Sequence, residues 1–182
     1  MKSRPNGLPG FHRFRFVTIV AAVTCLILLT KAEPLHASPS SAPDIPSNIV
    51  QTVSNALVEH LTTLDGAAFQ AKNQRMLVYY WATWCVNCLP KLRTELPAMA
   101  IPEGGEIVTV NTDKDIDRAK HFVDEESLKL TVLRDEGKQL STPLKAHAVP
   151  FWAVLEREGD HWKVLHARSG GTAEDMRAAF WK

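Results

Sequence analysis

The sequence predicts an α/β fold with a central mixed sheet flanked by helices. Short apolar segments typical of strands alternate with segments whose apolar residues recur at helical spacing. A continuous apolar run at 76–82 (MLVYYWA) indicates a central strand that is covered on both faces. Near the C-terminus, Glu158-Gly159-Asp160 separates two β-rich segments and predicts a hairpin, which adds an antiparallel edge to a parallel core.

The first half of the domain is expected to contain two helices around the central strand. Apolar residues at helical spacing predict a short amphipathic helix over 49–61, and 61–64 fits a short strand. The central strand leads into a second helix over 85–100, which Pro97 kinks or ends. The inward face of this helix consists of three leucines, Leu89, Leu92 and Leu96.

The second half continues the alternation of strands and helices. A helix is expected over 115–128, with Asp115 and Asp117 near its positive end, and a short helix or turn within 138–146. Thr172 is expected to cap a last helix. The remaining strands are expected at four places, namely 106–111, 130–133, 151–156 and 162–167.

Charge and composition exclude several classes of protein. The chain of 182 residues fits one domain and has a formal net charge of +1, from 21 basic and 20 acidic residues. Five of the basic residues and none of the acidic ones lie in residues 1–32. The rest of the chain is therefore acidic overall and has no basic surface suited to a phosphate backbone, so we expect no nucleic-acid partner.

The N-terminal segment predicts export. Residues 16–30 form an uncharged, mostly apolar run that comes after several basic residues. Its length fits the apolar region of a secretory signal, whereas a membrane span usually needs about 20 residues. We interpret 1–32 as a signal peptide or N-terminal membrane anchor and 33–48, rich in Pro, Ser and Ala, as a linker. Residues 49–182 then form a periplasmic or otherwise extracytoplasmic domain, secreted or tethered through the apolar run.

The cysteines point to redox chemistry. Cys25 lies in the predicted leader, which leaves Cys85 and Cys88 as the cysteines of the domain. A bridge between them closes too short a loop to add much stability, so chemistry explains the pair better. At the start of a helix, free backbone N–H groups and the helix dipole favour a thiolate on the first sulfur. We expect Cys85 to attack, Cys88 to resolve the mixed disulfide, and no cofactor beyond this disulfide.

Three segments of the chain carry a resemblance to a known family. They are Tyr80 to Cys88 (YWATWCVNC), Val149-Pro150-Phe151, and Gly170-Gly171 before the last helix. The chain resembles the thioredoxin superfamily, and more closely its exported TlpA/ResA/CcmG-type thiol–disulfide oxidoreductases, over roughly residues 60–182. The resemblance implies a thioredoxin-like fold with a cis-proline at Pro150. It also implies that the backbone of Val149 lies beside the disulfide, where a substrate chain pairs in β fashion.

Three positions depart from the pattern of this family. Asn87 stands where a proline usually precedes the second cysteine, and Val149 replaces a threonine often found before the cis-proline. Lys91 occupies a position where many members carry a glutamate that helps to deprotonate the buried cysteine, and the next acidic residue is Glu95. Each of these changes bears on the reduction potential.

The predicted function is an exported thiol–disulfide oxidoreductase that reduces specific protein disulfides. Similar proteins act in this way in cytochrome c maturation or copper-site assembly. The resemblance implies a membrane electron carrier as the redox partner, and we expect a monomer. A disulfide oxidase or isomerase is an alternative within the same class of enzyme.

Two further interpretations concern metals and Trp84. A closed structural zinc site needs four ligands, usually from two CxxC pairs, and the chain has one such pair. A copper-binding or metallochaperone module could use both thiols with His147, which is otherwise interpreted as a surface residue of a loop. Trp84 either packs over the cysteine pair, limiting solvent access and helping to bind substrate, or is an ordinary core residue.

Overall fold

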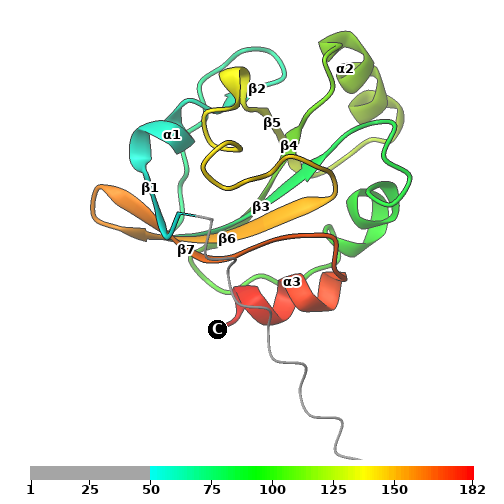
Figure 1. The fold of residues 1–182 in the computed structure, drawn as a ribbon. Coiled ribbons are helices and arrows are strands. Elements are labelled where there is room, and N and C mark those ends of the chain that lie inside the picture. Colours follow the sequence, from blue (N-terminus) through cyan, green and yellow to red (C-terminus); the bar gives the residue numbers. More distant parts are fainter. Residues whose placement is uncertain (1–49) are drawn as a thin grey trace, which may run out of the picture. The chain divides into compact units, whose positions relative to one another are not determined.

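Residues 50–182 are described by the computed structural model of the chain (Figure 1). The predicted leader at 1–32 and the linker at 33–48 lie outside the described residues, and both stay predictions. Among the helices of residues 50–182, none combines the length and apolarity that a membrane crossing requires. The elements in chain order are β1 (Thr52–Ser54), α1 (Asn55–Glu59), β2 (Thr62–Thr63), β3 (Arg75–Trp81), the π-helix η1 (Lys91–Glu95), β4 (Gly105–Asn111), α2 (Ile116–Glu125), β5 (Thr131–Arg134), the 3₁₀-helix η2 (Glu136–Lys138), β6 (Phe151–Glu158), β7 (His161–Ser169) and α3 (Ala173–Phe180).

β3 lies at the centre of a seven-stranded sheet with the strand order β1-β7-β6-β3-β4-β5-β2. It pairs in parallel with β4 and antiparallel with β6, and β5 continues the parallel part beyond β4. The predicted α/β class with a central mixed sheet is thereby confirmed. The prediction that the hairpin β6–β7 forms an edge is wrong, because β1 pairs with the outer side of β7. The other edge is β2, which pairs antiparallel with β5.

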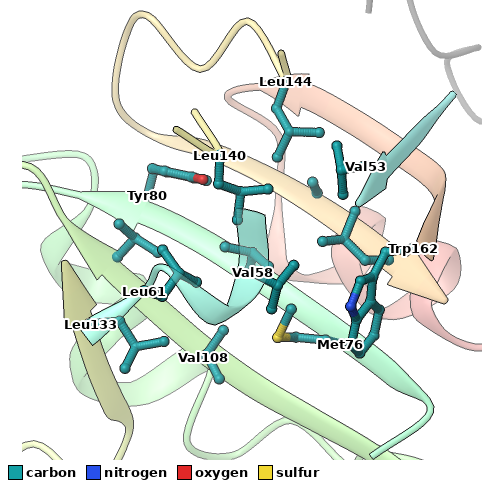
Figure 2. Packing of buried hydrophobic residues seen from close by; sticks show 14 of the residues in the cluster. Val53, Val58, Leu61, Met76, Tyr80, Val108, Leu133, Leu140, Leu144 and Trp162 are labelled. Atoms are coloured by element: carbon teal, nitrogen blue, oxygen red, sulfur yellow. The ribbon is translucent and has the colours of Figure 1, made fainter. Parts of the chain in front are cut away.

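The apolar run of β3 is fully buried, and its alternating side chains join two parts of the core on opposite faces of the sheet. The even-numbered residues of 76–80 pack with Val58 of α1 (Figure 2). The odd-numbered residues of 77–81 pack with Met176 and Phe180 of α3. Figure 1 accordingly shows α1 and α3 on opposite sides of the sheet. Burial on both faces explains why this strand has no polar alternation.

The helix predicted over 49–61 is shorter than expected, and a strand precedes it. β1 places Val53 opposite Trp162 of β7, and Val53 is buried there. Helical spacing did not decide this segment, because pairing with β7 satisfies backbone groups of β1 and buries its apolar residue equally well. The short strand expected within 61–64 is present as β2.

The helix predicted over 85–100 is also shorter, and its type differs. A turn occupies 86–88, helical structure begins at Leu89, and most of the helical segment is the π-helix η1. In η1 the N–H of Leu96 donates to the carbonyl of Lys91 at 2.8 Å, one residue further back than in an α-helix. The segment after the cysteines therefore begins as a turn and ends as a widened helical turn.

Local hydrogen bonding explains why this helix is irregular. The hydroxyl of Thr94 donates to the carbonyl of Pro90 at 2.9 Å, the acceptor that the N–H of Thr94 would use in an α-helix. Pro97 lacks an N–H and cannot continue the ladder. Leu92 and Leu96 are nevertheless buried, so the helix still covers the sheet face that carries the cysteines.

The last helix forms as predicted. The hydroxyl of Thr172 accepts the N–H of Asp175 at 3.1 Å, and the carboxylate of Asp175 accepts the N–H of Thr172 at 2.8 Å. This reciprocal capping box satisfies two N–H groups at the start of α3. Just before it, Gly170 and Gly171 have φ angles of +70° and +89°, which favour glycine. The indole N–H of Trp152 donates to the Gly170 carbonyl at 2.8 Å and ties this turn to β6.

Candidate redox site

The two predicted cysteines lie just beyond the C-terminal end of β3 and form a disulfide. Their Cα atoms are 5.3 Å apart, and the N–H of Cys88 donates to the carbonyl of Cys85 at 2.8 Å. Cys85 is 6% exposed and Cys88 is 0% exposed. The fold therefore brings the pair together at the edge of the sheet and leaves Cys85 as the more accessible of the two.

A buried carboxylate holds the segment that leads into the disulfide. Asp113, which is 9% exposed, accepts the backbone N–H of Thr83 at 2.8 Å and the hydroxyl of Thr83 at 3.1 Å. It also accepts the side-chain amide of Asn111 at 2.8 Å, and the Oδ1 of Asn111 accepts the N–H of Asp113 at 3.0 Å. These bonds fasten the loop after β4 to the loop after β3, shortly before Cys85.

Asn111 and Asp113 were not predicted as site residues, although their position in the sequence indicates such a role. Both stand where the second parallel strand ends, and the carboxyl ends of neighbouring parallel strands meet at one edge of a sheet. Thr112, between them, donates from its N–H and its hydroxyl to the Trp81 carbonyl, at 2.8 and 3.1 Å. Polar residues directly after a parallel strand are therefore candidates for positioning the loop that follows the neighbouring strand.

Val149 and Pro150 come directly before β6, and the peptide bond between them is cis. Val149 packs against both parts of the core, including the cluster that contains Cys85 and Cys88. Its backbone N–H and C=O have no hydrogen-bond partner within residues 50–182, whereas the Pro150 carbonyl accepts the N–H of Gly170 at 2.8 Å. Val149 thus has backbone groups available to a second chain.

The two residues on either side of Cys85 in the chain are large, apolar and open to solvent. Trp84 is 62% exposed and Val86 is 78% exposed. The interpretation of Trp84 as an ordinary core residue is therefore wrong. Asn87, the departure from the family pattern, is exposed in the same turn. Exposed apolar residues around a reactive group are typical of a surface that contacts another molecule.

A pocket of about 650 Å³ lies between the loops after β3, β4 and β5 and is bordered by Trp84, the residue before Cys85. We call it the side pocket; its lining includes Trp84, Asp113, Lys114, Lys138, His147 and Val149. His147 is exposed there. Within residues 50–182, no three His, Cys, Asp or Glu side chains are grouped closely enough to hold a metal ion. The structure therefore does not bring His147 together with both cysteines, as the copper alternative requires.

Two neighbouring tyrosines of β3 have buried hydroxyls, and neither hydroxyl has a hydrogen-bond partner within residues 50–182. Burial raises the pKa of Tyr79, and the carboxylate of Glu95 raises it further. Burial also raises the pKa of Tyr80, with Asp135 adding to the effect. Both hydroxyls are thus neutral donors at ordinary pH. Tyr79 packs with the cysteines, whereas Tyr80 borders the side pocket.

Comparisons with known proteins agree with the fold and the site. The thiol–disulfide oxidoreductase ResA of Bacillus thuringiensis is 24% identical over 127 residues, which cover 67% of this chain and 72% of ResA. The solved structure of StoA from Bacillus subtilis matches with a TM-score of 0.54 and 18% identity, over 72% of this chain and 98% of StoA. No model of a protein family matches the chain.

A second solved structure, the exposed lipoprotein thioredoxin of Streptococcus pneumoniae, matches with a TM-score of 0.56 and 21% identity. The match covers 66% of this chain and 96% of that protein. Together these structures confirm the predicted thioredoxin-like fold. The named relatives also confirm the predicted class of enzyme, a thiol–disulfide oxidoreductase.

Proposed function

We propose that this chain, a thioredoxin-superfamily protein of the TlpA/ResA/CcmG type, is an exported reductase of specific protein disulfides. Its enzyme class, thiol–disulfide oxidoreductase, implies protein thiols and disulfides as substrates. The observation that carries the proposal is the disulfide at the end of β3, in which Cys85 is more exposed than Cys88.

Cys85 is the attacking sulfur in this proposal. The N–H groups of Val86 and Asn87, in the turn directly after Cys85, have no hydrogen-bond partner within residues 50–182. Free N–H groups next to a sulfur stabilise a thiolate, which is the nucleophile of disulfide exchange. Regular helix begins only at Leu89, so these local N–H groups replace the longer helix dipole that the sequence suggested.

The reaction is an exchange in two steps. In the reduced protein, the Cys85 thiolate bonds to one sulfur of a substrate disulfide, and the other substrate sulfur leaves as a thiolate. Cys88, once deprotonated, then attacks the Cys85 sulfur and releases the second substrate sulfur. The substrate gains two electrons and two protons, and the protein is left with the disulfide present here. A dithiol electron carrier in the membrane then reduces this disulfide again.

The substrate chain is proposed to lie along Val149, Pro150 and Trp84. The unpaired N–H and C=O of Val149 are able to bond an extended segment that carries the target cysteine. Trp84 and Val86, the exposed neighbours of Cys85 in the chain, supply apolar contact. Backbone pairing of this kind accepts many sequences, so side chains further along the substrate set specificity.

Export rests on the predicted leader at 1–32 and on similar proteins. One solved structure of this fold is a secreted disulfide oxidoreductase of Mycobacterium tuberculosis, and another is an exposed lipoprotein. Fusing residues 1–48 to alkaline phosphatase tests this part, because that enzyme is active only where disulfides form. Phosphatase activity that is lost when residues 16–30 are deleted from the fusion supports export. An inactive fusion that carries all of residues 1–48 contradicts export.

The direction of the reaction is tested by two measurements. The reduced Cys88→Ser variant is expected to accumulate a mixed disulfide between Cys85 and a substrate peptide that carries a disulfide, and Cys85→Ser is expected to form none. Equilibrium with glutathione then gives the reduction potential. A value close to about −270 mV supports a reductase, whereas a value close to about −120 mV supports a disulfide donor and overturns the proposed direction.

A further inference from the structure

The side pocket is bordered by two residues that the proposed substrate site also uses. They are Trp84, the neighbour of Cys85 in the chain, and Val149. Its opposite wall comes from the loop after β4 and from η2 with the segment after it, including Lys114 and Lys138. A polypeptide that pairs with Val149 therefore extends naturally into the pocket with the residues next to its cysteine.

Two acidic side chains of this pocket are turned into the protein, whereas its unpaired basic side chains lie at the rim. The carboxylate of Asp113 is turned inward onto Thr83 and Asn111. The carboxylate of Asp135 is likewise turned inward and accepts two backbone N–H groups, those of Leu140 at 3.1 Å and Ser141 at 2.7 Å.

At the rim, Arg134 is paired with Glu136 at 3.1 Å. Lys114 and Lys138 are exposed, and neither has an ion-pair partner anywhere in the described part of the chain. The rim consequently presents two uncompensated positive charges to an incoming chain. The lining as a whole has three basic and three acidic side chains, so the unpaired positive charge is confined to the rim.

A buried hydrogen-bond donor, without a partner in the described part of the chain, lies in the wall of the pocket. Tyr80 is 0% exposed, borders the pocket, and its hydroxyl has no partner within residues 50–182. Figure 2 shows this hydroxyl at the end of a ring that lies beside Leu140. A buried donor without an acceptor is unfavourable, and a bound polar group that accepts from it removes that cost.

We propose that the side pocket recognises an acidic segment of the substrate protein adjacent to its reactive cysteine. The carboxylates of that segment pair with Lys114 and Lys138, and one of its main-chain carbonyls accepts the hydroxyl of Tyr80. A neutral carbonyl suits the interior better than a carboxylate, because Asp135 lies close to Tyr80. This inference rests on the proposed exchange at Cys85 and adds the class of substrate to it.

Three peptides with the same disulfide test the preference for charge. Their flanking residues are glutamate, glutamine or lysine, and the reduced protein is assayed for kcat/KM with each peptide at low and at high salt. We expect the glutamate peptide to be reduced about ten times faster than the lysine peptide at low salt, with the ratio falling as salt screens the charges.

Charge reversal supplies the decisive comparison. The double variant Lys114→Glu and Lys138→Glu is expected to lose or invert the preference, measured as the ratio of its kcat/KM values for the glutamate and lysine peptides. The control Lys72→Glu and Lys129→Glu changes net charge equally, but both residues precede parallel strands and lie at the opposite end of the sheet. The control should keep the preference, and a preference that survives in the first variant overturns the inference.

The glutamine peptide separates failure of this inference from failure of the proposed function. Exchange with that peptide but no charge preference in the wild type overturns the inference alone. Absence of exchange with all three peptides overturns both.

The variant Tyr80→Phe tests the bond inside the pocket. We expect KM to rise about threefold for all three peptides with kcat unchanged, because one neutral hydrogen bond is lost. Tyr79→Phe is the matched control, since its hydroxyl is also buried and unpaired but does not border the pocket. Equal KM values for Tyr80→Phe and the wild type contradict this part of the inference.

Discussion

Replacing Asp113 is expected to affect stability in a way that depends on the shape of the new side chain rather than on its charge. Asp113→Ala removes the acceptor of the Thr83 N–H and of the Asn111 amide, each at 2.8 Å in a site that is 9% exposed. A buried donor without a partner costs about 1–3 kcal/mol. Two such donors give an expected loss of about 4 kcal/mol, a large part of the stability of a small domain.

Asp113→Asn has the same shape and is expected to cost far less. The carboxylate oxygen Oδ2 accepts both the Thr83 N–H and the Asn111 amide, and the amide oxygen of the new residue can take its place. The new NH₂ group then faces the Thr83 hydroxyl, which is able to accept as well as donate. These hydrogen bonds lose only the extra strength that the negative charge of Asp113 gives them, so we expect the free energy of unfolding to fall by about 1 kcal/mol.

Urea unfolding of both variants and the wild type, all with the disulfide closed, measures these free energies of unfolding. Equal m-values are required, so that the comparison concerns the folded state. Glutathione exchange rates give a second readout, and Asp113→Ala should exchange more slowly because the segment before Cys85 is no longer fastened. A loss below about 1 kcal/mol for Asp113→Ala, or equal losses for both variants, refutes the role assigned to this carboxylate.

Three other perturbations have expected outcomes. Gly105→Ala should cost about 1–3 kcal/mol in urea unfolding, because its Cβ would lie 2.9 Å from the buried ring of Phe180; an unchanged midpoint contradicts this. Tyr79→Phe should leave stability unchanged or raise it by up to about 1 kcal/mol, and a clear loss would show that its hydroxyl has a partner. The Thr172 N–H donates to the carboxylate of Asp175 and holds the pKa of that carboxyl below its ordinary 3.8. The contribution of this bond to the free energy of unfolding is therefore complete above pH 3.8, and it is lost as the pH falls through the pKa that Asp175 has in the folded protein. Asp175→Asn should therefore show a shallower decline of stability from about pH 4 downward, and parallel curves argue against this bond.

Much of the site could be predicted because its signals are local. The apolar run of β3 has no polar alternation, which indicates burial on both faces and hence a central position. The spacing of Cys85 and Cys88 permits a short disulfide wherever a turn comes after such a strand. The capping box of α3 is likewise readable from Thr172 and Asp175, since its partners are three residues apart.

Elements whose shape depends on distant partners were predicted poorly. β1 was taken for part of a helix because its strand geometry comes from pairing with β7, which lies more than a hundred residues away in the chain. The helix after the cysteines was predicted as a regular α-helix. The sequence does not reveal that the Thr94 hydroxyl, rather than its N–H, bonds to the Pro90 carbonyl. Trp84 was given two interpretations, of which its 62% exposure excludes the core residue, while packing over the cysteine pair stays a prediction.

The amino-acid sequence by itself determined the kind of chemistry, since two cysteines in one turn after a buried strand are sufficient for disulfide exchange. Only the tertiary structure decided what surrounds that chemistry. Asp113 and the two lysines of the side pocket follow the parallel strands β4 and β5, which end at the same edge of the sheet as β3. Val149 comes to that edge for a different reason, because β6 runs antiparallel to β3 and begins there. Contacts of this kind depend on how strands are ordered in space, and short-range patterns along the chain do not contain that order.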